Sequence, residues 1–154
     1  MNRFDAEERI MIALDCPDAD SAWRLVRRLD GFRGYWKVGM ELFYAAGPQF
    51  VRELKQNGQR IFLDLKLHDI PNTVKGAAAS ITRLGADMFN VHAAGGDVMM
   101  RAALEGVDEA QRSDPSLARP TVIAVTQLTS TNQRTLNEEI GIPGPLAEIG
   151  REHV

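Results

Sequence analysis

Several charged residues lie near the ends of apolar runs that would otherwise be buried. Asp15 closes one such run and Lys37 lies within a second. Asp64 and Lys66 share a third. A charge in an apolar strand is costly unless it is paired or used, because burial removes its hydration. Ligands of α/β proteins bind at the C-terminal ends of the strands, so these side chains are candidates for a binding or catalytic site.

The spacing of Asp64, Lys66 and Asp69 carries the most chemical information. Asp64 and Lys66 are two residues apart, so on a strand they share a face and the neighbouring leucines point the other way. Asp69 follows just beyond the strand end. A lysine between carboxylates is held protonated by their field, which suits a general acid. From residue types alone, a buried ion-pair network that fixes the strand register explains the cluster equally well.

Metal and nucleotide motifs are weak in this sequence. A metal site would use His68, Asp69 and His92, but their spacing resembles no known ligand set, so we expect no metal and two hydrogen-bonded structural histidines. Gly95-Gly96-Asp97 could cradle an anion at a helix start, although a tight strand-to-helix turn is the simpler interpretation. The first apolar run is not followed by G-x-G-x-x-G, which argues against a dinucleotide-binding Rossmann domain.

Apolar runs alternate with amphipathic stretches along the chain. The apolar runs predict strands over residues 9–15, 35–40, 60–67, 88–92 and 121–125. The amphipathic stretches predict helices from an N-cap at Asp18 or Asp20 to Gly31, from Pro48 to Gly58, from Pro71 to Gly85, over 97–112 and from Pro145, with a polar loop over 126–137. This alternation implies parallel strands joined by right-handed crossovers. A doubly wound sheet and a (β/α)8 barrel both satisfy it.

Composition limits the class of protein. The 154 residues are 44% hydrophobic and 25% charged, which is typical of one soluble domain, here residues 1–154. A net charge of −3 without a basic stripe argues against a nucleic-acid partner. The polar N-terminal segment has no signal-peptide core, and no run reaches the length of a membrane span. The single cysteine, Cys16, excludes an internal disulfide and is interpreted as a packing residue. We expect a cytoplasmic protein.

A resemblance adds to these inferences. The run Asp64-Leu65-Lys66-Leu67-His68-Asp69-Ile70-Pro71-Asn72-Thr73 resembles the signature of the orotidine 5′-monophosphate decarboxylases. Other segments agree with that family in order: Ala13-Leu14-Asp15, Lys37-Val38-Gly39, Gly47-Pro48-Gln49-Phe50, Asn90-Val91-His92-Ala93 and Thr126-Gln127-Leu128-Thr129-Ser130. The resemblance implies a TIM-type (β/α)8 barrel. Such a barrel typically needs about 250 residues, so we expect an incomplete, N-terminal portion with about five of its eight strands.

The resemblance also implies an activity. It implies decarboxylation of orotidine 5′-monophosphate to UMP in pyrimidine biosynthesis, without metal or cofactor, by a homodimer with shared active sites. Lys66 is then the proton donor to C6 of the pyrimidine, Asp64 lies beside the substrate carboxylate, and Lys37 extends the charge array to the ribose. Asp69 and Thr73 are implied to reach into the neighbouring subunit's site. The other implied substrate contacts are Asp15 at the ribose, Ile70, Thr129, and Ser130 at the pyrimidine edge.

Two other functions stay open. Hexulose-phosphate synthases and ketogulonate-phosphate decarboxylases share D-x-K-x-x-D but use magnesium, and here His68 with Ile70-Pro71-Asn72-Thr73 favours the orotidine enzyme. The second is a non-catalytic remnant that only binds nucleotides or dimerises, because the family's phosphate-binding glutamine and arginine belong to later strand ends. We accordingly expect the chain as given to expose an unpaired strand edge and to have little activity alone.

Overall fold

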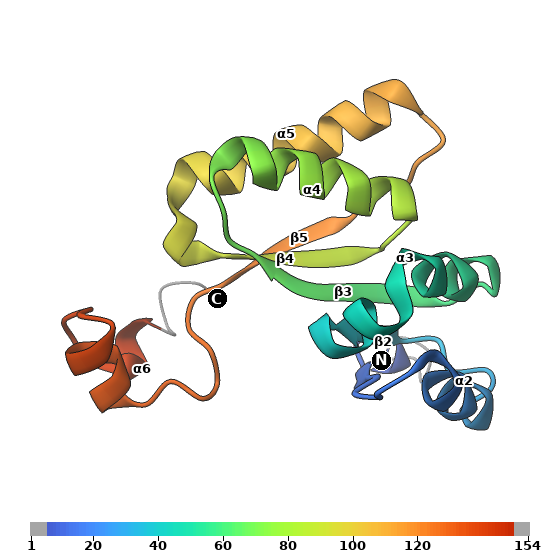
Figure 1. Ribbon diagram of the computed structural model, residues 1–154, viewed down its shortest axis with the longest axis horizontal. Helices are drawn as coiled ribbons and strands as arrows, with labels where there is room; N and C mark the ends of the chain where they lie inside the picture. The colour runs from blue at the N-terminus through green and yellow to red at the C-terminus, as the bar shows by residue number, and fades with distance from the viewer. Residues whose placement is uncertain (1–5, 150–154) are drawn as a thin grey trace.

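One parallel sheet organises the computed structural model, which describes residues 6–149 (Figure 1). Its strands are β1 (Met11–Ala13), β2 (Tyr35–Gly39), β3 (Arg60–Leu67), β4 (Met88–His92) and β5 (Thr121–Val125). They are hydrogen-bonded in the order β1-β2-β3-β4-β5, and each neighbouring pair is parallel. Because this order never reverses, successive crossovers place their helices on one face, as in a TIM barrel. The order excludes the doubly wound alternative, which requires a reversal.

A helix follows each of the first four strands, and two short helical segments follow β5. These elements are α2 (Ala19–Arg28), α3 (Met40–Gln56), α4 (Pro71–Leu84), the 3-10 turn η1 (Ala93–Gly95), α5 (Gly96–Ser113), the π-helix η2 (Thr135–Glu139) and α6 (Leu146–Ile149). The predicted cap of α2 is confirmed, since the Asp18 carboxylate accepts a hydrogen bond from Ser21 N–H at 2.7 Å. Gly85 ends α4 with a φ of 82°. Within residues 6–149, none of the helices is long and apolar enough to cross a bilayer.

Helix α3 differs from the prediction. The sequence placed its start at Pro48, whereas the helix begins at Met40, directly after β2. Gly47, with φ 72° and ψ 178°, breaks the helix, and Pro48 opens its second half. The first half was missed because Gly39 caps it without a side chain and no loop separates it from β2. The first strand is also shorter than predicted, because only Met11–Ala13 pairs with β2.

Side-chain alternation divides the sheet into a packed outer face and an open inner face. Residues on the outer face are covered by the helices and are at most 1% exposed, namely Trp36, Val38, Ile61, Leu63, Phe89 and Val91. On the inner face, Met11 and Ile123 are 44% and 38% exposed. The inner face is therefore the side on which a ligand can reach polar side chains carried by the strands.

Candidate active site at the C-terminal ends of the strands

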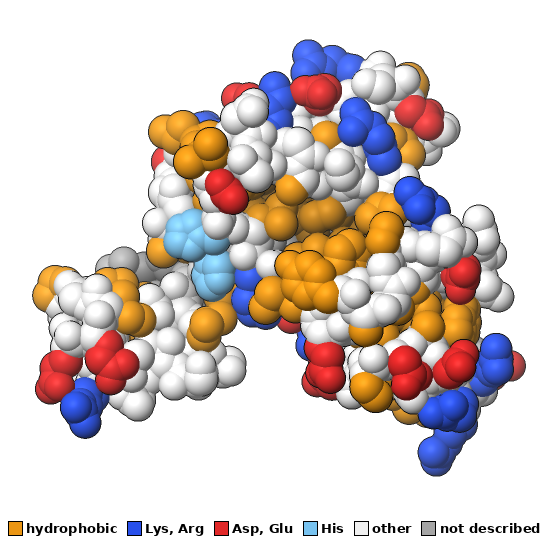
Figure 2. Space-filling model, in the orientation of Figure 1, with side chains coloured by type: hydrophobic (Ala, Val, Ile, Leu, Met, Phe, Trp, Pro, Cys, Tyr) orange, Lys and Arg blue, Asp and Glu red, His pale blue; other side chains and the backbone are white. Residues whose placement is uncertain are grey.

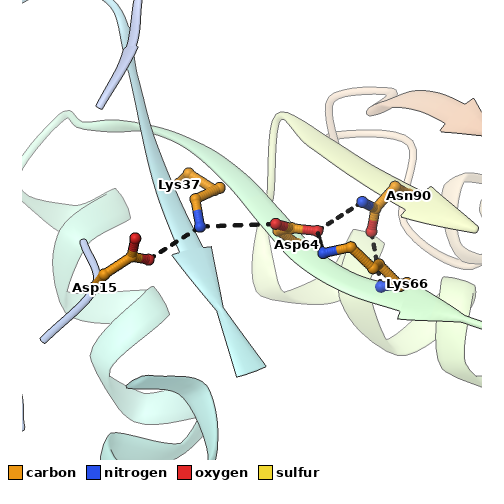
Figure 3. Close-up of polar contacts among 5 residues, drawn as sticks. All are labelled: Asp15, Lys37, Asp64, Lys66 and Asn90. Carbon is orange, nitrogen blue, oxygen red and sulfur yellow. Dashed lines mark hydrogen bonds and ion pairs between the residues drawn. The ribbon is translucent and has the colours of Figure 1, made fainter. Parts of the chain in front are cut away.

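Four side chains of alternating charge form a continuous array across the first three strands (Figure 3). Just after β1, Asp15 Oδ1 accepts a hydrogen bond from Lys37 Nζ of β2 at 3.0 Å. Lys37 Nζ lies 3.7 Å from Asp64 Oδ2 of β3. Asp64 Oδ1 in turn accepts a hydrogen bond from Lys66 Nζ at 2.6 Å. The Asp15 side chain is 70% exposed and that of Asp64 only 12%, so the array runs from solvent into the sheet.

The expected division of β3 into two faces is confirmed. Asp64 and Lys66 meet at one side of the strand. Leu63 is fully buried in the core, while Leu65 and Leu67 line a hollow of about 480 Å³ between α3 and α4. Figure 2 shows this hollow as an apolar depression on the helix-covered side. The charge array and the hollow therefore lie on opposite sides of β3.

The sequence interpretation did not single out Asn90, the residue of β4 that faces Asp64. Its Nδ2 donates a hydrogen bond to Asp64 Oδ1 at 2.7 Å, and its Oδ1 accepts one from Lys66 N–H at 2.7 Å (Figure 3). A signal was present in the sequence, because Asn90 is the polar residue inside the apolar run from Met88 to Val91. An amide in a buried strand requires partners, and charged residues on the next strand are suitable ones.

The Asp64 carboxyl group is held in its anionic form. Burial is the largest single influence and raises its pKa. Hydrogen bonds from Lys66 and Asn90, together with the positive charges of Lys66 and Lys37, outweigh burial, so the pKa lies below the usual carboxyl range. The site thus presents a carboxylate and an ammonium group side by side. Such a pair can repel an anionic group of a ligand and donate a proton to the atom that this group leaves.

Asp69 does not join this array within one chain. It follows β3 and is exposed, and its Oδ1 accepts a hydrogen bond from Ile70 N–H at 2.6 Å. Among residues 6–149, Asp69 forms no ion pair, and the Lys66 ammonium pairs with Asp64. The prediction that Lys66 lies between two carboxylates is therefore wrong for a single chain, because the backbone leaves the sheet after Leu67 to begin α4. Ile70 is 67% exposed and Thr73 is exposed as well, so all three side chains project into solvent.

Thr129 and Ser130 lie in the loop that follows β5, at the same end of the sheet as the array. Both are exposed. In the described part of the chain, no hydrogen bond connects either residue with the four charged side chains. A contact of these two residues with a ligand therefore remains a prediction.

Two histidines stand beside Lys66, at the ends of β3 and β4. The ring centroids of His68 and His92 are 5.3 Å apart, and Figure 2 shows histidine side chains together on the surface. Burial, followed by the nearby charges of His68 and Lys66, lowers the pKa of His92, which favours its neutral form. Across residues 6–149, the His, Cys, Asp and Glu side chains form no group of three that could hold a metal ion. The predicted turn at Gly95-Gly96 is confirmed, with a φ of 80° at Gly96.

Comparisons with known proteins agree on one family. A sequence model described as the orotidine 5′-phosphate decarboxylase / HUMPS family matches residues 8–153. The orotidine 5′-phosphate decarboxylase of Cutibacterium acnes is 54% identical over 145 residues, which are 94% of this chain and 59% of that protein. That of Bacillus cereus is 50% identical over 141 residues, which are 92% of this chain and 58% of that protein. This chain therefore spans slightly under three fifths of the length of these curated relatives.

Two solved structures have a similar fold. The orotidine 5′-phosphate decarboxylase of Lactobacillus acidophilus superposes with a TM-score of 0.85 at 38% identity, over 92% of this chain and 63% of that one. An uncharacterized conserved protein from Geobacillus kaustophilus superposes with a TM-score of 0.85 at 50% identity, over 93% of this chain and 66% of that one. The sequential parallel sheet described above is thus the arrangement of a TIM barrel.

Proposed function

Since the chain belongs to the orotidine 5′-phosphate decarboxylase / HUMPS family, we propose that this protein removes carbon dioxide from orotidine 5′-monophosphate and yields UMP. The observation that carries the proposal is the array at the C-terminal strand ends, which consists of Asp15, Lys37, Asp64 and Lys66. Its alternating charges lie where a barrel enzyme binds its substrate. The curated relatives cited above carry the name of this activity.

The chemistry requires a proton donor fixed at one carbon. Loss of carbon dioxide breaks the bond between C6 and the carboxylate carbon and leaves the electron pair on C6, where no adjacent group of the ring accepts it. An ammonium group held at C6 stabilises this developing charge. Lys66 Nζ then transfers a proton to C6, a C–H bond forms, and the neutral amine regains its proton from water. In these steps the proton passes from water to the lysine side chain and from there to C6.

Asp64 and Lys37 prepare the ground state for this step. The lowered pKa of Asp64 keeps a carboxylate beside the position proposed for the substrate carboxylate, and repulsion between the two favours departure of carbon dioxide. The hydrogen bond of 2.6 Å to Asp64 restrains the Lys66 ammonium group. Lys37 and Asp15, which are joined at 3.0 Å, are proposed to bind the ribose hydroxyl groups. Binding energy from such remote contacts can be used to raise the catalytic rate.

A second copy of the chain is proposed to complete the site. Asp69, Ile70 and Thr73 project into solvent just after β3, and no cation of the described residues pairs with Asp69. In a homodimer these side chains would reach the neighbouring subunit's substrate, and Asp69 would add a second carboxylate beside that subunit's Lys66. Thr129 and Ser130, from the loop after β5, are proposed to contact the pyrimidine. We place the reaction in the cytoplasm, where the free thiol of Cys16 would persist.

Substitution of Lys66 by alanine tests the proposal. In the protein at its full natural length, Lys66→Ala should lower kcat for orotidine 5′-monophosphate by about 100- to 10,000-fold, the usual contribution of a general acid. Binding of UMP should change by less than about tenfold, because the lysine acts on charge that develops during the reaction. Lys75→Ala is the matched control, since this lysine of α4 pairs with Glu109 at 3.4 Å, away from the array. Turnover of Lys66→Ala within about tenfold of the wild type would refute the role.

A further inference from the structure

Asn90 is a buried amide whose partners all belong to the charge array. It is 2% exposed, and both ends of its side chain are used, one by the Asp64 carboxylate and the other by the Lys66 backbone. Its inner-face neighbour on β4 is Met88, and the residue that pairs with it on β5 is Ile123. Both are apolar, so an apolar side chain at position 90 would fill the same space. The amide therefore has a use other than packing.

The backbone near Asn90 is irregular in a way that aims Lys66. Leu63 pairs with Phe89 and Leu67 pairs with Val91, so three residues of β3 face the single residue Asn90. Within this bulge Lys66 has a φ of 49°, a left-handed conformation that costs a non-glycine residue about 1–2 kcal/mol. Bulges of this kind redirect a side chain and are common beside active sites.

A bulge also leaves backbone groups without their ladder partners. Here Asn90 Oδ1 accepts the hydrogen bond of Lys66 N–H at 2.7 Å, in place of a backbone carbonyl. Its Nδ2 donates to Asp64 Oδ1 at 2.7 Å, the same oxygen that accepts from Lys66 Nζ. One amide thus fixes both the backbone of the lysine and the carboxylate that restrains its ammonium group (Figure 3).

We propose that Asn90 is a positioning residue, which holds the bulge of β3 and the Asp64 carboxylate so that the Lys66 ammonium group points at the reacting carbon. The inference rests on the proposed decarboxylation and adds to it a residue outside the charge array. Asn90 itself touches no reacting atom. It acts through the orientation of Lys66 and through the hydrogen bond that helps to keep Asp64 ionised.

Two variants of the full-length protein test the role of Asn90 as an acceptor for Lys66 N–H and its role as a donor to Asp64. Asn90→Ala removes both hydrogen bonds. Asn90→Asp keeps the shape and an acceptor for Lys66 N–H, but places a second carboxylate oxygen against Asp64. Both should lower kcat by about 10- to 100-fold with KM within about threefold, because a displaced catalytic group costs rate more than binding. Thr82→Val is the matched control. Thr82 is the other buried polar residue of the described chain, and its hydroxyl group donates a hydrogen bond to Ala78 O within α4.

The pH dependence provides a readout that a purely structural role would not change. Asp64 is faced by Lys37 of β2 and Lys66 of β3, and His92 of β4 lies near Lys66; none of these is altered in the variants. With one donor lost, the pKa of Asp64 should rise, so the acidic limb of the kcat profile should move to higher pH. Carbon-13 NMR of the Asp64 carboxyl, assigned with Asp64→Asn, should show the same rise without any turnover.

The outcomes are distinguishable. Slower turnover in both Asn90 variants together with a raised Asp64 pKa supports the proposal. A kcat within about twofold of the wild type, an unmoved Asp64 titration, or an equal loss in Thr82→Val overturns it. If the wild-type protein does not decarboxylate orotidine 5′-monophosphate, the proposed function fails, and the carboxyl titration alone then decides whether Asn90 sets the state of Asp64.

Discussion

Replacing Lys66 by methionine should destabilise the protein, because the Asp64 carboxylate would lose its nearest counter-charge. The two groups are 2.6 Å apart, and their side chains are only 24% and 12% exposed. Exposed ion pairs contribute up to about 1 kcal/mol, whereas removal of one partner of a fully buried pair costs about 3–5 kcal/mol. Asn90 and Lys37 still stabilise the carboxylate after the substitution. We therefore expect the free energy of unfolding to fall by about 1–3 kcal/mol.

A double-mutant cycle isolates the pair. Urea unfolding at pH 7 of the wild type, Lys66→Met, Asp64→Asn and the double variant should give a coupling of about 1–2 kcal/mol. The matched control is the pair of Arg101 and Asp97 on α5, which is similarly short at 2.7 Å but whose side chains are 74% and 68% exposed. Its coupling should be about 0.3–0.5 kcal/mol. Equal couplings for the two pairs would refute the argument that burial sets the magnitude.

Lowering the pH provides a second check on the same double-mutant cycle. The pKa of Asp64 is lowered in the fold, because its hydrogen bonds and neighbouring charges outweigh the burial that raises it. A carboxyl group with a lowered pKa adds stability that is fully present above its unfolded pKa and is lost as the pH falls through its folded pKa. The Lys66–Asp64 coupling should accordingly decline across that window. A coupling that stays constant through it would contradict the assignment of the stabilisation to an ionised Asp64.

Three further expectations concern metal, partner and packing. Prolonged treatment with a chelator should leave turnover unchanged; activity lost and then restored by magnesium would instead favour the magnesium-dependent members of the family. Mixing inactive Lys66→Ala and Asp69→Ala proteins should regenerate activity if subunits exchange, and no recovery despite demonstrated exchange would show that each site is self-contained. Gly106→Ala should lower the free energy of unfolding by about 1–3 kcal/mol, because its Cβ would collide with the carbonyl oxygen of Lys75 across α4 and α5. The control is Gly76→Ala, whose added Cβ would have no atom within 4 Å, so this variant should be neutral or stabilising by up to about 1 kcal/mol. A smaller loss of unfolding free energy for Gly106→Ala than for this control would contradict the packing argument.

The sequence by itself determined the elements and most of the charged array. Period-two alternation placed Asp64 and Lys66 together, and positions near strand ends singled out Asp15 and Lys37. These signals are local, since they depend on neighbouring residues in one strand. The family signature that begins at Asp64 is local as well, so it could be recognised without any coordinates.

Only the tertiary structure decided how the strands meet. The sequential strand order excluded the doubly wound sheet, and the bulge of β3 set the conformation of Lys66 and brought Asn90 against Asp64. The tertiary structure also showed that Asp69 lies outside the charge array within one chain. Register, bulges and cross-strand hydrogen bonds depend on residues far apart in sequence, such as Lys66 and Asn90, 24 positions apart. No window along the chain contains that information, because the contact exists only once two strands have paired.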